Sequence, residues 1–162
     1  MGQIETIMPN NTSQGFTLVE LMVAVLIVGI LAAVAIPMYA KNIQSTARSE
    51  AEGELINAAS HMEQLYTSSL SYANATVTTA TTGGTIAGWA PSNTALTAAK
   101  YTIAFAAGSP TTTAYTIIAT ATAAQTNGQF FEVIALNNQG QHCIKQSSSS
   151  LSSCTFGTDP SW

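Results

Sequence analysis

Two cysteines near the C-terminal end of the chain are the residues best suited to covalent chemistry. Cys143 and Cys154 are the only cysteines of the sequence, and a close pair of this kind is typical of a disulfide in a protein that works outside the cytoplasm. Closing so short a loop removes on the order of 3 kcal/mol of unfolded-chain entropy in the loop model. Two unpaired buried thiols are the alternative. A zinc site that includes His142 lacks a fourth ligand and a paired-cysteine spacing, so no metal is expected.

The acidic and histidine side chains do not form a catalytic arrangement. Four glutamates cluster in the middle of the chain and fit a solvated helix face better than a general acid–base pair: Glu50, Glu52, Glu54 and Glu63. Neither His61 nor His142 has an evident partner at catalytic spacing. We therefore expect neither enzymatic activity nor a cofactor.

Cations are scarce in this chain of 162 residues. Its Lys and Arg residues number four, and the formal net charge is -4; the four are Lys41, Arg48, Lys100 and Lys145. Too few cations are available to neutralise a phosphate backbone, so binding to DNA is disfavoured. Only 7% of the residues are charged while 46% are hydrophobic, which is an unusual composition for a cytosolic protein.

One glutamate lies inside a long apolar stretch. Residues 16–36 are apolar except for Thr17 and Glu20, and at ~1.5 Å per residue a helix of this length spans a hydrocarbon core of ~30 Å. A carboxylate at mid-membrane costs roughly 2.5 to 3.5 kcal/mol, and less near the headgroups, so Glu20 needs a partner or a place at the membrane surface. Gly15, a small residue suited to cleavage, directly precedes this stretch. A secretory signal has its apolar stretch before the cut, so here the apolar segment would stay with the mature protein.

The segment that begins at Gly15 resembles the N-terminal segment shared by type IV pilins and the pseudopilins of type II secretion. A Gly-Phe cut site, a glutamate four residues later and an unbroken apolar span occur together in GFTLVELMVAVLIVGILAAVAIP. Weaker similarity to the PilE-like group of pilins extends over AEGELINAASHMEQLYTSSLSYA, YTIAFAAG, AYTIIATA and the cysteine pair. The resemblance implies cleavage after Gly15 by a prepilin peptidase and N-methylation of Phe16. It also implies assembly by a cytoplasmic ATPase and a platform protein, and passage through an outer-membrane secretin. Pilin leaders are usually short and basic, whereas residues 1–15 contain no Lys or Arg.

Cleavage after Gly15 would give the new N-terminus a partner for the buried acid. The α-ammonium of Phe16 on one subunit would pair with the Glu20 carboxylate of the next, and in a dry helix bundle this pair would set the axial register. The alternative is that Glu20 lies at headgroup level. Further along, Gly29 and Pro37 weaken the backbone of the helix, since glycine is costly mid-helix and proline lacks an amide donor. The resemblance implies that this stretch loses helicity in the filament; a simple kink at the membrane exit is the alternative for Pro37.

The rest of the sequence predicts an amphipathic helix followed by an antiparallel sheet. From Tyr39 onward, apolar residues recur at helical spacing and extend one helix to roughly fifty residues; they are Ile43, Ala47, Ala51, Leu55, Ala58, Met62 and Leu65. Turn signals then separate β-rich runs, which lie at residues 101–106, 114–123 and 130–136, with a short fourth at 141–145. The expected fold is α+β, a type IV pilin fold in which the long helix packs on about four antiparallel strands.

The expected organisation has five parts. They are a leader at 1–15, a transmembrane and filament-core helix at 16–38, the amphipathic half of the helix at 39–70, a connecting loop at 71–100, and the sheet with its disulfide-closed region at 101–162.

The expected function is that of a structural subunit of a type IV pilus. It would be stored in the inner membrane and then polymerise through its N-terminal helix into a surface filament for adhesion, twitching motility or DNA uptake. One alternative is a minor pilin or binding subunit, either a tip adhesin or a DNA-uptake receptor, with specificity in the loop closed by the cysteines. Another is a type II secretion pseudopilin. That group often carries an acidic calcium loop near its C-terminus, whereas only Asp159 follows Glu132 here. The sequence does not decide between a major and a minor subunit.

Overall fold

The computed structural model describes residues 15–79, 82–92, 95–126 and 128–162, which fall into two compact units divided after Ala40. The predicted leader, apart from Gly15, lies outside the described residues. The second unit, Lys41–Trp162, is called the head below. One helix, α1 (Leu18–Ser69), supplies most of the described part of the first unit and continues into the head.

Helix α1 begins directly after a threonine that caps it. The Glu20 amide donates a hydrogen bond to Thr17 Oγ1 at 3.2 Å, and the Leu21 amide donates to the Thr17 carbonyl at 3.2 Å, so Thr17 caps the first turn. The helix has 52 residues and runs unbroken through Gly29 and Pro37. Both the predicted helix and its predicted length are therefore confirmed.

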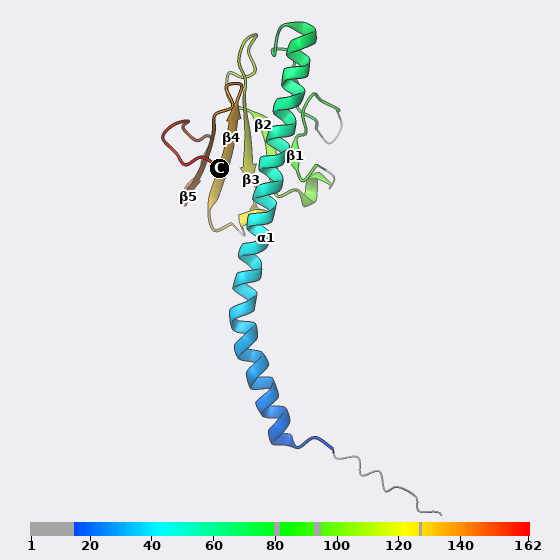
Figure 1. Ribbon diagram of the computed structural model, residues 1–162, viewed down its shortest axis with the longest axis vertical. Coiled ribbons are helices and arrows are strands. Elements are labelled where there is room, and N and C mark those ends of the chain that lie inside the picture. The colour runs from blue at the N-terminus through cyan, green and yellow to red at the C-terminus, as the bar shows by residue number, and fades with distance from the viewer. Residues whose placement is uncertain (1–14, 80–81, 93–94, 127) are drawn as a thin grey trace, which may run out of the picture. The chain divides into compact units, whose positions relative to one another are not determined.

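The head contains a five-stranded antiparallel sheet with strand order β1-β2-β3-β4-β5 (Figure 1). Its strands are β1 (Trp89–Ala90), β2 (Tyr101–Phe105), β3 (Thr116–Ala121), β4 (Phe131–Asn137) and β5 (His142–Ser147). A 3-10 turn, η1 (Leu96–Ala98), precedes β2, and a short helix, α2 (Ala123–Thr126), follows β3. The α+β fold and the four predicted strands are confirmed. The sheet has one strand more than the expected four, because two residues of the predicted connecting loop pair with β2, Trp89 opposite Thr102.

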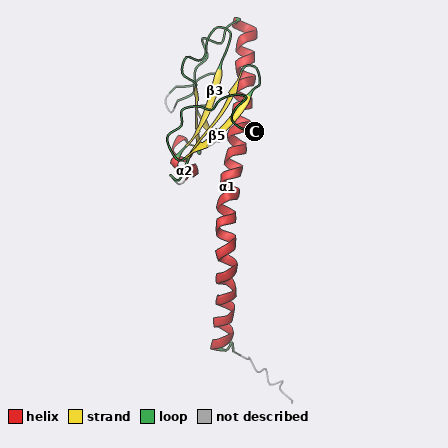
Figure 2. Ribbon diagram, turned by 90° about the vertical axis from the view of Figure 1, so that its left-hand side faces the viewer, coloured by secondary structure: helices red, strands yellow, loops and turns green. Residues whose placement is uncertain are grey.

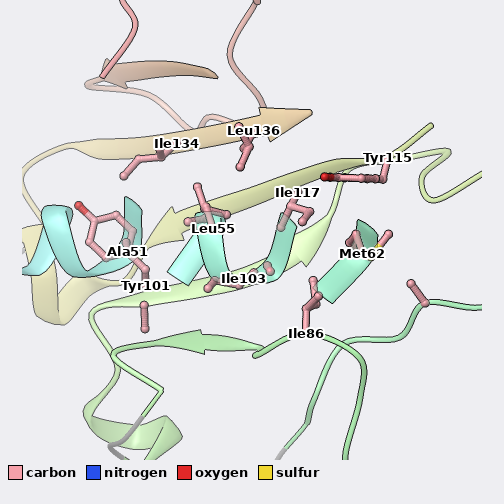
Figure 3. Close-up of a cluster of buried hydrophobic side chains, with 14 of the residues drawn as sticks. Ala51, Leu55, Met62, Ile86, Tyr101, Ile103, Tyr115, Ile117, Ile134 and Leu136 are labelled. Carbon is pink, nitrogen blue, oxygen red and sulfur yellow. The ribbon is translucent and has the colours of Figure 1, made fainter. Parts of the chain in front are cut away.

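The hydrophobic core of the head lies between α1 and one face of the sheet (Figures 2 and 3). The predicted stripe supplies Ala47, Ala51, Leu55, Ala58 and Met62, all at most 4% exposed. The alanines allow close approach to the sheet, while each fully buried large side chain contributes about 1.5 to 3 kcal/mol. Ile43, which we expected in this stripe, is 41% exposed instead. The helix has a polar neighbour at this level, since the Gln125 side chain donates to the Gln44 carbonyl at 2.8 Å.

Strand β4 is buried on both faces. Ile134 and Leu136 belong to the core under α1, whereas Ala135 packs on the opposite face with Cys143 and Cys154. The C-terminal segment also extends the edge of the sheet, because the Ile144 amide donates to the Pro160 carbonyl at 2.7 Å. The disulfide-closed region therefore forms a second, smaller core against the sheet.

Candidate functional site

The first part of α1 presents apolar side chains to its surroundings on every side. The large apolar residues among positions 16–39 are between 50% and 85% exposed. The helix is long and apolar enough to cross a membrane, and none of its most apolar 18-residue window is buried. So large an apolar surface is unfavourable in water and requires lipid or other apolar helices around it.

The predicted processing residues lie together at the start of this helix. An added Cβ at Gly15 would meet no atom within 4 Å, so local packing does not require glycine there. Phe16 is 85% exposed. Glu20 lies in the first turn of α1, where a carboxylate is favoured by the helix dipole. Within the described residues, its side chain has no hydrogen bond or ion pair. Cleavage, methylation and the role of Glu20 in assembly stay predictions.

Gly29 and Pro37 both lie inside continuous α-helix. At Gly29 an added Cβ would meet no atom within 4 Å, so a larger residue would fit in the isolated chain. The predicted loss of helicity concerns the assembled filament and stays a prediction.

A buried carboxylate joins α1 to the sheet. Glu132 on β4 is 0% exposed and accepts two hydrogen bonds from Arg48, from Nε at 3.1 Å and from Nη2 at 2.5 Å. The Tyr101 hydroxyl and the Gln146 side-chain amide also donate to it. Burial raises the pKa of Glu132, but the hydrogen bonds from Arg48, Gln146 and Tyr101 outweigh burial and hold this pKa below its usual range. This ionised, fully bonded group is suited to fixing the helix on the sheet and not to proton transfer.

Sequence analysis missed this pair. Arg48 was expected to face water, whereas it is part-buried and bound to Glu132. A glutamate inside the apolar run FFEVIAL was the available signal, because a charged residue in a buried strand needs a partner.

A second carboxylate accepts hydrogen bonds from tyrosine hydroxyl groups. Tyr72 donates to Glu63 at 3.0 Å and Tyr115 donates to it at 3.3 Å. Tyr72 and Tyr115 also pack edge to face, with ring centroids 4.9 Å apart. Burial and the neighbouring Glu63 charge raise the pKa of Tyr115. Glu63 was expected to face water; it is exposed but serves as an acceptor for two buried rings.

The disulfide predicted between Cys143 and Cys154 is present, with Cα atoms 6.0 Å apart and a sequence separation of 11. Lys145, inside the closed loop, forms an ion pair with Asp159 at 3.4 Å. The hydrogen bond from the Thr155 amide, and then Lys145, lower the pKa of the Asp159 carboxyl. The region after β4 is thus held both covalently and by charge.

The cations of the described chain do not gather into a basic patch. Arg48 pairs with Glu132 and Lys145 pairs with Asp159. The Lys100 ammonium donates to the Ala124 carbonyl at 3.0 Å. Among the described residues, no group of three or more His, Cys, Asp or Glu side chains could hold a metal ion. These contacts leave few charges for binding phosphate.

Comparison with known proteins adds two family matches. A family described as "Type IV minor pilin ComP, DNA uptake sequence receptor" matches residues 37–130, and the "Prokaryotic N-terminal methylation motif" matches residues 10–36. The chain is similar to the "Type IV major alpha-pilin" and the "Fimbrial protein Q" of Moraxella bovis. It is 47% identical to each over 45 residues, which are 28% of this chain, 28% of the first relative and 29% of the second. The chain thus spans under a third of the length of these relatives. No solved structure matches significantly.

Proposed function

Since the chain belongs to the family of the type IV minor pilin ComP, DNA uptake sequence receptor, we propose that it is a minor subunit of a type IV pilus. The chain is a type IV pilin, as its N-terminal segment predicted. Pilin families consist of structural, non-enzymatic proteins, which agrees with the expectation of no catalysis. In our proposal, the subunit waits in the inner membrane, is cut after Gly15, is methylated at Phe16 and enters a surface filament.

The single observation that carries the assembly part of this proposal is the exposure of the apolar helix at residues 16–39 on every side. A helix that served only the head would bury one face and expose polar residues on the other, as α1 does from Ala47 onward. A helix with no polar face suits two apolar environments in succession. Lipid surrounds it in the membrane, and the helices of other pilin subunits surround it in the filament.

Glu20 supplies the specificity that an apolar surface lacks. Apolar packing alone allows neighbouring helices to slide, whereas a single carboxylate must find a cation at a defined height. Cleavage after Gly15 creates such a cation at Phe16, near the Glu20 level of the same helix. In our proposal, Glu20 of an incoming subunit binds the α-ammonium of a subunit already in the filament.

Receptor activity for DNA is the second candidate, and the family description favours it. The charges of the head limit its mechanism, because Arg48 and Lys145 are already paired with carboxylates. Binding would then depend mainly on contacts other than phosphate neutralisation. The adhesion and twitching functions expected from the resemblance have no comparable support from the described head.

Mass spectrometry of sheared surface filaments tests the main proposal. We expect the mature chain to begin with N-methylated Phe16, to contain the Cys143–Cys154 disulfide, and to be much less abundant than the principal subunit of the same filament. Equal or greater abundance would assign it as a major subunit. A chain that begins elsewhere, or that is absent from filaments, would overturn the proposal.

A further inference from the structure

The head holds a pocket outside the apolar segment 16–39 that we propose for assembly. It has a volume of about 520 Å³ and is lined by α1 and by the segment that leads into β1. Glu54, Asn57 and His61 line it from α1, and their spacing of three and four places them on one helical face. Trp89 of β1 and Ser92 line it from the opposite side.

The wall opposite α1 is held in place by its own backbone. The Thr78 amide donates to the Ile86 carbonyl at 2.9 Å, and the Ile86 amide donates to the Thr76 carbonyl at 3.1 Å. An added Cβ at Gly88 would lie 2.0 Å from the Thr78 carbonyl oxygen, and one at Gly84 would lie 2.4 Å from backbone of Val77. Glycine is therefore required at both positions, and the pocket is formed before any ligand arrives.

The chemistry of the lining disfavours an anionic ligand. Among the described lining residues there is no Lys or Arg, and Glu54 is the carboxylate. Glu54 Oε1 accepts hydrogen bonds from the Ser92 amide at 3.3 Å and from the Ser92 hydroxyl, which fix its orientation. A fixed carboxylate repels phosphate and other anions. The Trp89 indole offers a flat apolar surface, whereas Asn57 and His61 offer donors and acceptors at the exposed rim.

We propose that this pocket binds a neutral saccharide. One ring of the sugar packs its apolar face against Trp89, and its hydroxyl groups bind the side chains of Asn57 and His61. The Glu54 carboxylate accepts from a further hydroxyl and excludes acidic sugars. This binding function is separate from polymerisation, because no residue of the apolar segment 16–39 lines the pocket.

Isothermal titration calorimetry of the full chain tests this proposal. The protein is held in phosphatidylcholine nanodiscs, because these carry no sugar headgroups that would compete. The probes are lactose, mannotriose and chitotriose, with 6′-sialyllactose as the acidic counterpart of lactose and a single-stranded oligothymidylate as a nucleobase probe. We expect saturable binding of at least one neutral sugar, no stronger binding of sialyllactose than of lactose, and no preference for the oligothymidylate.

Variants locate the binding in the pocket. Asn57→Ala and His61→Ala each remove an exposed side chain. Each should lower the affinity for the neutral sugar by about fivefold, the equivalent of one lost neutral hydrogen bond. Gln64→Ala, also exposed on α1 but outside the lining, is the matched control and should leave affinity unchanged. Failure of all three neutral sugars to bind at millimolar concentration would overturn the proposal. So would equal effects of the three variants, or preferential binding of sialyllactose or of the oligothymidylate.

Discussion

Arg48 on α1 and Glu132 on β4 form a two-point ion pair although they lie 84 positions apart in the chain. The carboxylate is fully buried and the guanidinium side chain is 33% exposed. Such a pair contributes little beyond a good apolar contact, but removing one partner leaves a buried charge without compensation. It therefore specifies where the helix sits on the sheet.

Replacement of Arg48 should destabilise the head. We expect Arg48→Ala to lower the free energy of unfolding by about 3 kcal/mol, since the buried Glu132 charge keeps only its neutral donors. The double variant Arg48→Met with Glu132→Leu should recover most of the loss, because it leaves no unpaired charge. Urea unfolding followed by tryptophan emission measures both, since Trp89 and Trp162 lie in the head. An unchanged midpoint for Arg48→Ala would contradict the role assigned to this pair.

Acid should weaken the head through the same carboxylate. The pKa of Glu132 lies below its ordinary value of 4.5 in the folded protein. A lowered pKa stabilises the fold above the ordinary value, and this contribution is lost as pH falls through 4.5 towards the folded pKa. We expect the urea midpoint to fall over that window. Glu132→Gln should show a flatter profile, apart from a smaller loss in the same direction from the part-buried Asp159, whose pKa is also lowered. An equally steep profile in Glu132→Gln would assign the acid sensitivity elsewhere.

The disulfide should keep the C-terminal segment packed on the face of β4 opposite the main core. Cys143→Ser removes a cross-link of sequence separation 11, which the loop model values at about 3 kcal/mol. It also loosens the packing of the disulfide-closed region against Ala135. We expect the C-terminal segment to become sensitive to protease and the chain to reach the surface in lower amounts. Cys154→Ser should match it, and reduction of the unchanged chain should reproduce the protease pattern. Full protease resistance in the variants would show that packing and the Lys145–Asp159 pair suffice.

The sequence predicted the elements of this protein better than their long-range pairings. Helix α1 was predictable because helical spacing persists over many turns, and β2 to β5 were predictable because Gly- and Asn-containing turns separate them. Strand β1 was not, since two residues show no period and their strand character comes from pairing with β2. Likewise, nothing local connects Arg48 with Glu132. Ile43 continued the apolar spacing, yet the core begins at Ala47.

The candidate sites divide in the same way. Gly15, Phe16 and Glu20 are neighbours in sequence, so a local pattern was enough to predict a processing and assembly motif. The pocket beside Trp89 combines side chains from α1 with a separate segment that begins at Thr78, and it has no sequence signature. The sequence analysis named a DNA-uptake receptor as an alternative but disfavoured DNA binding because the cations are few; the family description favours that alternative.

Glu20 should matter for incorporation and not for insertion. We expect Glu20→Ala subunits to enter the membrane and to be cut after Gly15, because the apolar span and cut site are intact, but to incorporate poorly into filaments. Glu20→Asp keeps the charge and should be intermediate, whereas Glu20→Gln keeps the size and should resemble alanine. Each variant is expressed together with the unchanged subunit, and quantification in sheared filaments gives the ratio of variant to unchanged subunit. Equal incorporation of Glu20→Ala would remove the register role.

Binding of duplex DNA should depend only weakly on salt. Two of the four cations already have carboxylate partners, which leaves Lys41 and Lys100 for phosphate contacts. If about two phosphates are neutralised, the logarithm of the binding constant should fall with the logarithm of the salt concentration with a slope of about -2. This slope is far shallower than that of a basic DNA-binding protein. Fluorescence anisotropy with labelled duplexes over a salt series measures the slope, and Lys100→Gln should reduce its magnitude by about one. A slope about two units steeper would mean that Arg48 and Lys145 exchange their carboxylates for phosphates. In that case the two ion pairs of the head would open on binding, and Arg48→Ala would weaken DNA binding as well as the fold.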